Sequence, residues 1–148
     1  MKYIKMFESY EKLSDACREG DLNVVIEFIE NKKVDVNNIN KYGYSSLILA
    51  ADNNRIDIVK YLIEKGADVN YQDAYERTAL HYAAMRKNIN IIKILIEAGS
   101  NWNLKDDNDE DFLFYIKNTK VYMDMIMSEY TEQYEKYLSI KNSEKFNL

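Results

Sequence analysis

The sequence has no proline, four glycines, one cysteine and one histidine among its 148 residues. A single cysteine, Cys17, excludes an intramolecular disulfide and a cysteine-rich metal site, and it points to a reducing compartment. We therefore expect a cytoplasmic protein. Four glycines provide no glycine-rich loop that could hold a phosphate group. One histidine leaves little from which to build a catalytic triad.

Long apolar runs and an excess of positive charge are also missing. Nowhere do about 18 apolar residues follow one another, which excludes a transmembrane helix. The N-terminal lysines are followed by Glu8, Glu11 and Asp15 instead of an apolar stretch, so we expect no signal peptide. The 25 acidic residues exceed the 20 basic ones, and this balance argues against binding to nucleic acid. We expect neither a nucleic-acid nor a membrane partner.

The chain does contain enough apolar residues for a core, since 47% of its residues are hydrophobic. A chain of this length is expected to fold as a single domain instead of remaining disordered.

A period of 33 residues runs through the chain. Four kinds of position recur at this step: Asn40, Asp73 and Asp106; Leu47, Leu80 and Leu113; Asn37, Asn70 and Asn103; and Ser45, Thr78 and Asp111. Side chains of the last set can accept a hydrogen bond from the first turn of a helix. The period therefore predicts that a helix begins after each of these three residues.

Each unit of the period contains two predicted helices. The stretch Thr78-Ala79-Leu80-His81-Tyr82-Ala83-Ala84 places Leu80, Ala83 and Ala84 on one face. A second helix follows with an apolar stripe, and Gly99 is positioned to end it. The preceding unit repeats this pattern up to Gly66. The order is helix, turn, helix and projecting loop.

These residues resemble the ankyrin repeat. Thr78-Ala79-Leu80-His81 is similar to the family's Thr-Pro-Leu-His tetrapeptide, and the stretch from Ile58 to Asn70 is close to its consensus. The resemblance covers residues 8 to 116 and implies an all-α fold, an ankyrin-repeat solenoid of stacked helix-turn-helix units. Within one domain, residues 1–148, we expect repeats at about 8–39, 40–72, 73–105 and 106–118 onward, the first and last of them degenerate.

The units depart from a strict repeat in three places. The first unit matches the second only after a shift of 34 residues, which predicts one extra residue near Asn31 to Lys33. The turn glycine of the family is present at Gly43 but is replaced by Glu76 and Asp109, so we expect irregular loops in those units. The 33-residue equivalents of Leu95 and Ile96 are polar, which predicts that the stack stops in the fourth unit.

The segment at about 120–141 reads as one long amphipathic helix, because it has neither glycine nor proline. Its apolar stripe consists of Met123, Ile126, Met127, Tyr130, Tyr134 and Tyr137. We expect this helix to cover the end of the stack, as repeat arrays require. Docking of a partner on this helix is the alternative.

Residue chemistry offers no sign of an enzyme or of a cofactor. The resemblance implies that His81 forms hydrogen bonds within and between loops, and Cys17 aligns with a packed alanine, Ala51. The acidic run at residues 106–111 has neither the glycine nor the glutamate that a calcium loop needs at its sixth and twelfth positions. We expect these acids to be solvated and to favour the start of the following helix. A weak cation site is the alternative.

The concave side of such a stack, formed by first helices and loop tips, is the expected binding surface. By register, its helical residues are Leu49, Asp52, Tyr82, Met85, Arg86 and Tyr115. Its loop residues, which resemble variable contact positions of ankyrin repeats, are Lys41, Tyr42, Tyr44, Tyr75 and Arg77. Tyrosine offers a large and rigid contact, and the composition is typical of interface hot spots.

The leading hypothesis is a monomeric, non-enzymatic module that binds a partner protein through its middle repeats. Two narrower forms remain open: an inhibitor or immunity protein that blocks a toxin or enzyme, and a bacterial or viral effector acting in the cytosol of a host. A self-associating scaffold subunit, assembled through the C-terminal tyrosine and methionine residues, is the alternative from another class.

Overall fold

The computed structural model describes residues 2–146, with the side chains of residues 8–143. Over that range the secondary structure is helical, with a single isolated β-bridge, and the all-α prediction is confirmed. The elements are α1 (Lys2–Glu19), α2 (Leu22–Ile26), the π-turn η1 (Glu27–Asn31), α3 (Ser46–Asp52), α4 (Ile56–Glu64), α5 (Ala79–Met85), α6 (Ile89–Glu97), α7 (Phe112–Ile116), α8 (Lys120–Glu129) and α9 (Thr131–Phe146).

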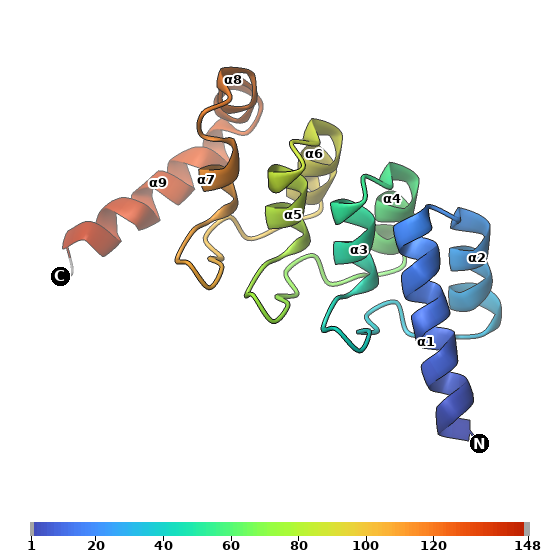
Figure 1. Cartoon of the computed structure of the whole chain (residues 1–148). Coiled ribbons are helices and arrows are strands. Elements are labelled where there is room, and N and C mark those ends of the chain that lie inside the picture. The colour runs from blue at the N-terminus through green and yellow to red at the C-terminus, as the bar shows by residue number, and fades with distance from the viewer. Residues whose placement is uncertain (1, 147–148) are drawn as a thin grey trace.

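The helices form pairs that stand side by side along the molecule (Figure 1). The first helices, α1, α3, α5 and α7, form one row, and α2, α4, α6 and α8 form a second row. Helix α3 packs against α1 and α5, and α5 packs in turn against α7. The loops between pairs project along one edge, and the two ends of the chain lie at opposite ends of the stack. The expected solenoid is therefore observed.

Helices α3, α5 and α7 begin where the period predicted. The Ser45 hydroxyl accepts a hydrogen bond from the Ile48 backbone N–H at 3.2 Å, and the Asp111 carboxylate accepts one from the Leu113 N–H at 3.0 Å. Each bond satisfies a donor of the first turn, which has no partner inside its own helix. At Thr78 the cap is reinforced by His81, whose Nδ1 accepts the Thr78 backbone N–H at 3.2 Å.

Small and branched apolar side chains fill the space between the two rows. Ala50, Ala51, Ala83 and Ala84 are fully buried, so neighbouring first helices approach closely. Buried isoleucines and leucines of the second helices pack behind them: Ile58, Leu62, Ile91, Ile92 and Leu95. Every helix pair thus covers apolar surface of the next pair, and burial at about 25 cal/mol per Å² holds the stack together.

The extra residue of the first unit is accommodated by the π-turn η1. The Lys32 N–H donates to the Glu27 carbonyl, five residues back, at 3.1 Å. A π-turn holds one residue more than an α-turn, so the chain returns to the common register without displacing the buried Phe28. The insertion was expected at Asn31 to Lys33, and the turn that absorbs it starts four residues earlier.

The prediction of one helix at about 120–141 is wrong. Helix α8 ends at Glu129, α9 begins at Thr131, and Tyr130 between them has a φ of −125°. Helix α8 lies in line with α2, α4 and α6 (Figure 1), so the fourth unit does have a second helix. Its buried residues, Ile126 and Tyr130, come 34 residues after Ile92 and Ile96, and a strict 33-residue step misses them.

Helix α9 lies against α7. The Tyr137 hydroxyl donates to the Asp111 carboxylate at 2.8 Å, and the Lys141 ammonium pairs with the same carboxylate. Beside α9, Trp102 meets the edges of Phe112 and Tyr130, with ring centroids 5.4 and 6.4 Å away. Of the predicted apolar stripe, Met127 is exposed, whereas the others are buried or partly buried.

Candidate binding surface

Three projecting loops are built on the same set of hydrogen bonds. In each, the side-chain oxygen of an asparagine or aspartate accepts two backbone N–H groups, from the residues two and four positions later. These bonds join Asn40 to Tyr42 and Tyr44, Asp73 to Tyr75 and Arg77, and Asp106 to Asn108 and Glu110, at 2.8 to 3.2 Å. The loop tips therefore recur at a fixed spacing with the same backbone shape.

The expectation of irregular loops at Glu76 and Asp109 is wrong. Gly43, Glu76 and Asp109 have φ values of 84°, 56° and 62°, and each N–H donates to the carbonyl three residues back. A residue with a side chain pays about 1–2 kcal/mol for this left-handed conformation. The loop hydrogen bonds impose it on Glu76 and Asp109 nevertheless.

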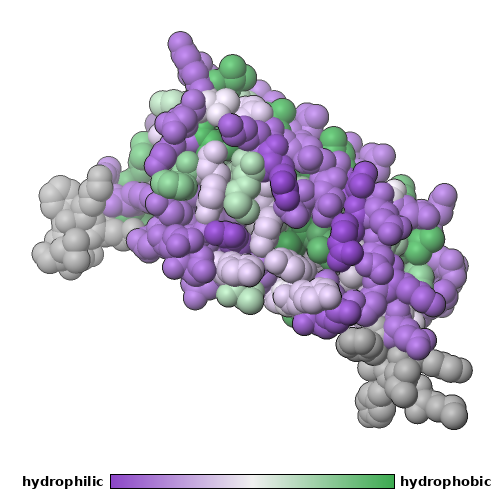
Figure 2. All heavy atoms as spheres, in the orientation of Figure 1, coloured by the Kyte–Doolittle hydropathy of each residue, from purple (hydrophilic) through white to green (hydrophobic). Residues whose placement is uncertain are grey.

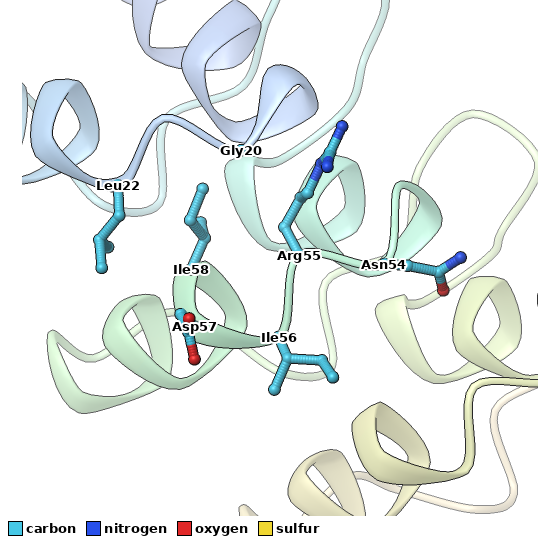
Figure 3. Close-up of a pocket in the computed structure, with 7 residues that line it drawn as sticks. All are labelled: Gly20, Leu22, Asn54, Arg55, Ile56, Asp57 and Ile58. Atoms are coloured by element: carbon cyan, nitrogen blue, oxygen red, sulfur yellow. The ribbon is translucent and has the colours of Figure 1, made fainter.

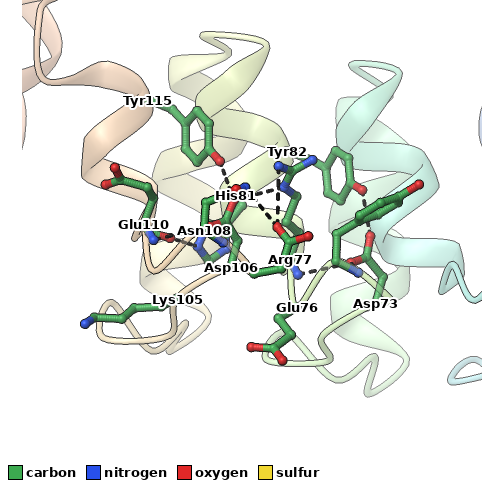
Figure 4. Close-up of polar contacts among 12 residues, drawn as sticks. Asp73, Glu76, Arg77, His81, Tyr82, Lys105, Asp106, Asn108, Glu110 and Tyr115 are labelled. Carbon is green, nitrogen blue, oxygen red and sulfur yellow. Dashed lines mark hydrogen bonds and ion pairs between the residues drawn. The ribbon is translucent and has the colours of Figure 1, made fainter.

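The acidic residue Asp106 is buried and fully hydrogen-bonded, contrary to the solvated loop that the sequence suggested (Figure 4). Arg77 donates to its Oδ2 atom at 3.1 Å, and the Tyr115 hydroxyl donates to the same atom. Burial raises the pKa of Asp106, but donors from Tyr115, Asn108, Arg77 and Glu110 outweigh burial and lower it below its ordinary value. Asp111 is likewise buried, whereas Asp107 and Asp109 are exposed.

Tyr82 and Tyr115 act as donors to the loop carboxylates of their own units. The Tyr82 hydroxyl donates to the Asp73 carboxylate at 2.6 Å, and burial together with this bond raises the pKa of Tyr82. In the second unit the equivalent residues are Asn40 and Leu49. The amide nitrogen of Asn40 is buried there without a hydrogen-bond partner among residues 8–143.

His81 joins two neighbouring units, as the resemblance implied. Because its Nδ1 accepts the Thr78 N–H, its Nε2 carries the proton and donates to the Glu110 carbonyl at 3.2 Å. Burial lowers the pKa of His81, which keeps the ring neutral. Cys17 is completely buried, and burial raises the pKa of its thiol to about 12. No cluster that could hold a metal ion occurs among the described residues.

The residues predicted to form the binding surface differ widely in exposure. Those exposed are Lys41, Tyr42, Tyr75 and Arg86; those partly buried are Tyr44, Asp52, Arg77, Met85 and Tyr115; and those buried are Leu49 and Tyr82. Arg77 and Tyr115 hold Asp106 inside the chain, so their polar ends are already occupied.

A hollow of about 220 Å³ lies on the concave side, where α1, α3 and α5 meet the first loop. Five of its lining residues were predicted: Tyr42, Tyr44, Leu49, Asp52 and Tyr82. The hollow lies beside Leu49, which has no ring where the next two units carry Tyr82 and Tyr115. Arg18, Ile48 and Asn53 complete the lining. Arg18 was missed because it comes from the first unit, where the register is shifted.

The rim of this hollow combines aromatic rings with an ion pair. Tyr44 meets the edge of Tyr82, with ring centroids 6.3 Å apart, and Arg86 pairs with Asp52 at 2.8 Å. Tyr42 stands out from the loop tip with 61% of its surface exposed. Figure 2 shows a mostly hydrophilic face in which pale and green side chains emerge near the middle.

A second hollow, of about 390 Å³, lies at the joint between the first two units (Figure 3). Arg55 crosses this joint and donates to the Arg18 carbonyl at 2.9 Å. Gly20 has a φ of 92°, and a Cβ atom there would lie 3.0 Å from Arg55. The contacts of this hollow hold two units together.

Comparison with known proteins supports the repeat architecture. A family model described as ankyrin repeats, in three copies, matches residues 13–106. BTB/POZ domain-containing protein 3 of Schizosaccharomyces pombe is 35% identical over 54 residues, which are 36% of this chain and 10% of that protein. Palmitoyltransferase AKR1 of Debaryomyces hansenii is 45% identical over 53 residues, 36% of this chain and 6% of that protein. The chain thus spans a tenth or less of either relative. Within the described part, no helix is both long and apolar enough to cross a membrane.

Proposed function

Since this chain belongs to the ankyrin-repeat family, whose repeats are generic modules for protein–protein interaction, we propose that it is a non-enzymatic protein that binds a partner protein through its concave side. The contact surface comprises the hollow beside Leu49 and the exposed loop residues Tyr42 and Tyr75. An apolar side chain of the partner enters the hollow, and the tyrosine rings close over the neighbouring residues.

The hollow beside Leu49 is the observation that carries this proposal. It joins three consecutive first helices to one loop tip, and it combines an apolar floor with the charged groups of Arg18 and Asp52. Such a floor with a polar rim is the composition expected of an interface centre. Arg86, bound to Asp52, extends the rim to the third unit.

A non-enzymatic role is supported by the state of the two residues best suited to catalysis. Cys17 is buried as a thiol, and both ring nitrogens of His81 are occupied by structural hydrogen bonds. The relative named as a palmitoyltransferase shares with this chain only a repeat-sized segment.

Affinity capture from the native cell tests the proposal. We compare the wild-type chain with a Tyr42→Ser/Tyr75→Ser variant, because both rings are exposed and neither hydroxyl has a printed role in the fold. The control is Val121→Ser/Met127→Ser, which removes exposed apolar groups from α8, away from the concave side. We expect the tyrosine variant to bind the captured partner at least about tenfold more weakly, and the control to bind normally. Unchanged affinity of a folded tyrosine variant contradicts the proposal.

The identity of the captured partner separates the narrower forms of this proposal. A toxin or an enzyme indicates an inhibitor or immunity protein, and a protein of a host cell indicates an effector. We also propose that the chain is monomeric, because Tyr130 and Tyr137 of the suggested assembly helix are buried against its own core. A mass that rises with concentration in light scattering favours the scaffold alternative instead.

A further inference from the structure

The loops that follow the second helices are tied to one another by asparagine side chains. The Oδ1 atom of Asn37 accepts the Asp68 backbone N–H at 2.7 Å, and Asn70 accepts the Asn101 N–H at the same distance. Each bond reaches the residue 31 positions later, in the next unit. The Asn37 amide also donates to the Gly66 carbonyl at 3.2 Å. One loop is thereby held by the asparagine of the loop before it.

The third asparagine of this series, Asn103, has no such partner. The residue 31 positions later is Tyr134, which lies in α9 and donates its own N–H to the Tyr130 carbonyl. Asn103 contacts only Asn101 of its own turn, through its amide nitrogen at 3.4 Å. Its Oδ1 atom therefore receives no hydrogen bond within the described part of the chain.

A hollow of about 560 Å³ lies where the next loop would stand, between Asn103 and α9. Trp102 and Ile96 provide apolar wall, and Gln133 and Lys136 approach from α9. This volume falls in the range of sites that bind small ligands. None of its lining residues belongs to the hollow on the concave side.

Two features of this hollow favour a polar occupant of negative charge. Ser100 stands where the preceding unit has Ala67, and its hydroxyl is buried without a hydrogen-bond partner among residues 8–143. Lys136 forms no ion pair over the same range, in contrast to Lys141 one turn later. A bound segment that carries an acidic residue would complement this ammonium group.

We propose that this hollow binds an extended acidic peptide segment of another protein, in the position of the missing next loop. The segment donates a backbone N–H to Oδ1 of Asn103, as Asp68 and Asn101 do for the two preceding asparagines. Its preferred sequence has an acidic residue, an apolar residue and asparagine, as in Asp68-Val69-Asn70 of this chain. The apolar side chain rests on Trp102, and the acidic residue lies near Lys136.

A synthetic peptide that copies residues 66–71, acetyl-Gly-Ala-Asp-Val-Asn-Tyr-amide, tests this site. In a titration followed by ¹H–¹⁵N NMR of the whole chain, we expect shifts confined to residues 96–103 and 133–137. Asn103→Ala should weaken binding about tenfold or more, since it removes the acceptor. The matched control is Asn118→Ala, at an exposed asparagine outside the hollow. Thermal unfolding checks that both variants are folded.

A second peptide carries a methyl group on the aspartate backbone nitrogen, which removes the donor and keeps every side chain. We expect this peptide to bind about tenfold more weakly or not at all. Equal binding of the methylated peptide, equal binding to Asn103→Ala, or shifts on the concave side would each overturn the proposal. Absence of any shift at about 5 mM peptide would also overturn it. None of these outcomes bears on the concave surface, so the two proposals fail independently.

Discussion

At the scale of single residues, the loop acids and the first-helix tyrosines form matched pairs. Asp73 is paired with Tyr82 and Asp106 with Tyr115, each nine residues later, whereas Asn40 is followed by Leu49. A buried carboxylate needs donors for both oxygens, because its desolvation is costly. An asparagine is neutral and tolerates an apolar neighbour. The pairs therefore explain why the hollow occurs in the second unit alone of these three.

The first prediction concerns the Tyr82 hydroxyl. Tyr82→Phe leaves one oxygen of buried Asp73 without its tyrosine donor, so we expect the free energy of unfolding to fall by about 1.5–3 kcal/mol. Urea denaturation followed by circular dichroism measures the change. Tyr42→Phe, at an exposed ring, serves as control and should have little effect. Equal stability of the two variants would show that the Tyr82–Asp73 bond contributes nothing.

The second prediction concerns pH and Asp106. Its pKa is lower in the folded than in the unfolded chain, because the hydrogen bonds from Tyr115, Asn108 and Arg77 outweigh burial. Its contribution to stability is complete above the unfolded pKa of about 4 and is lost as the pH falls through the folded value. We expect the wild type to lose more stability than Asp106→Asn on acidification below about pH 4. Asp109→Asn, at an exposed acid, should follow the wild type in acid denaturation.

Residue spacing predicted which side chains face the concave side, but it did not predict their exposure. Tyr42 and Tyr82 were indistinguishable in the sequence, yet one ring stands in solvent and the other is buried by a bond to Asp73. Whether a hydroxyl finds an acceptor depends on a loop nine residues away, and helical periodicity carries no such information. The spacing between Asp73 and Tyr82, repeated at Asp106 and Tyr115, was the signal that could have revealed it.

At the scale of elements, the projecting loop sets backbone conformation against residue preference. Hydrogen bonds to Asp73 force Glu76 into the left-handed region, where Gly43 stands one unit earlier. The sequence indicated an irregular loop because it weighed the preference of one residue. The structure shows that the paired bonds to the aspartate carboxylate decide the loop shape.

The third prediction follows from this conflict. Glu76→Gly removes the steric cost of the left-handed conformation, and we expect it to raise the free energy of unfolding by about 0.5–1 kcal/mol. Ala74→Gly in the same loop is the control, because position 74 has no positive φ, and it should be neutral or destabilising. Thermal and urea unfolding report both changes. A destabilised Glu76→Gly variant would show that the glutamate side chain itself supports the loop.

The break at Tyr130 shows why the C-terminal elements were harder to predict than the middle ones. Residues 121–137 contain no glycine and no proline, so local preference indicated an uninterrupted helix. Tertiary contacts decide otherwise: the Tyr130 hydroxyl bonds to Glu97 at 3.3 Å and its ring meets Trp102. These contacts hold Tyr130 in the core, and α9 starts in a new direction to reach Asp111.

At the scale of the whole molecule, the stack could be predicted because each contact between units recurs at the same step. Leu47, Leu80 and Leu113 are buried at one register, and the capping residues start three helices as expected. The ends escape this logic, since a terminal unit has a neighbour on one side only. There the chain uses a π-turn and an additional helix that no other unit contains.

The fourth prediction concerns the end of the stack. A chain that stops after Tyr130 loses α9, so Asp111 loses both Tyr137 and Lys141 and the surface of α7 is uncovered. We expect a lower urea midpoint and binding of an apolar dye, because the uncovered surface is hydrophobic. A chain that stops at Ser143 keeps both contacts and is the matched control. An unchanged midpoint in the shorter chain would show that α9 is dispensable for folding.

The third unit carries everything that its successor requires. A tandem copy of residues 73–105 inserted after Lys105 would give Asn103 the N–H of a duplicated Asn101, and Arg77 the carboxylate of a duplicated Asp73. Aspartate and tyrosine travel together in this 33-residue cassette, so its junctions need no redesign. The array is therefore open to lengthening by gene duplication at its centre, whereas α9 closes it to growth at the C-terminal end.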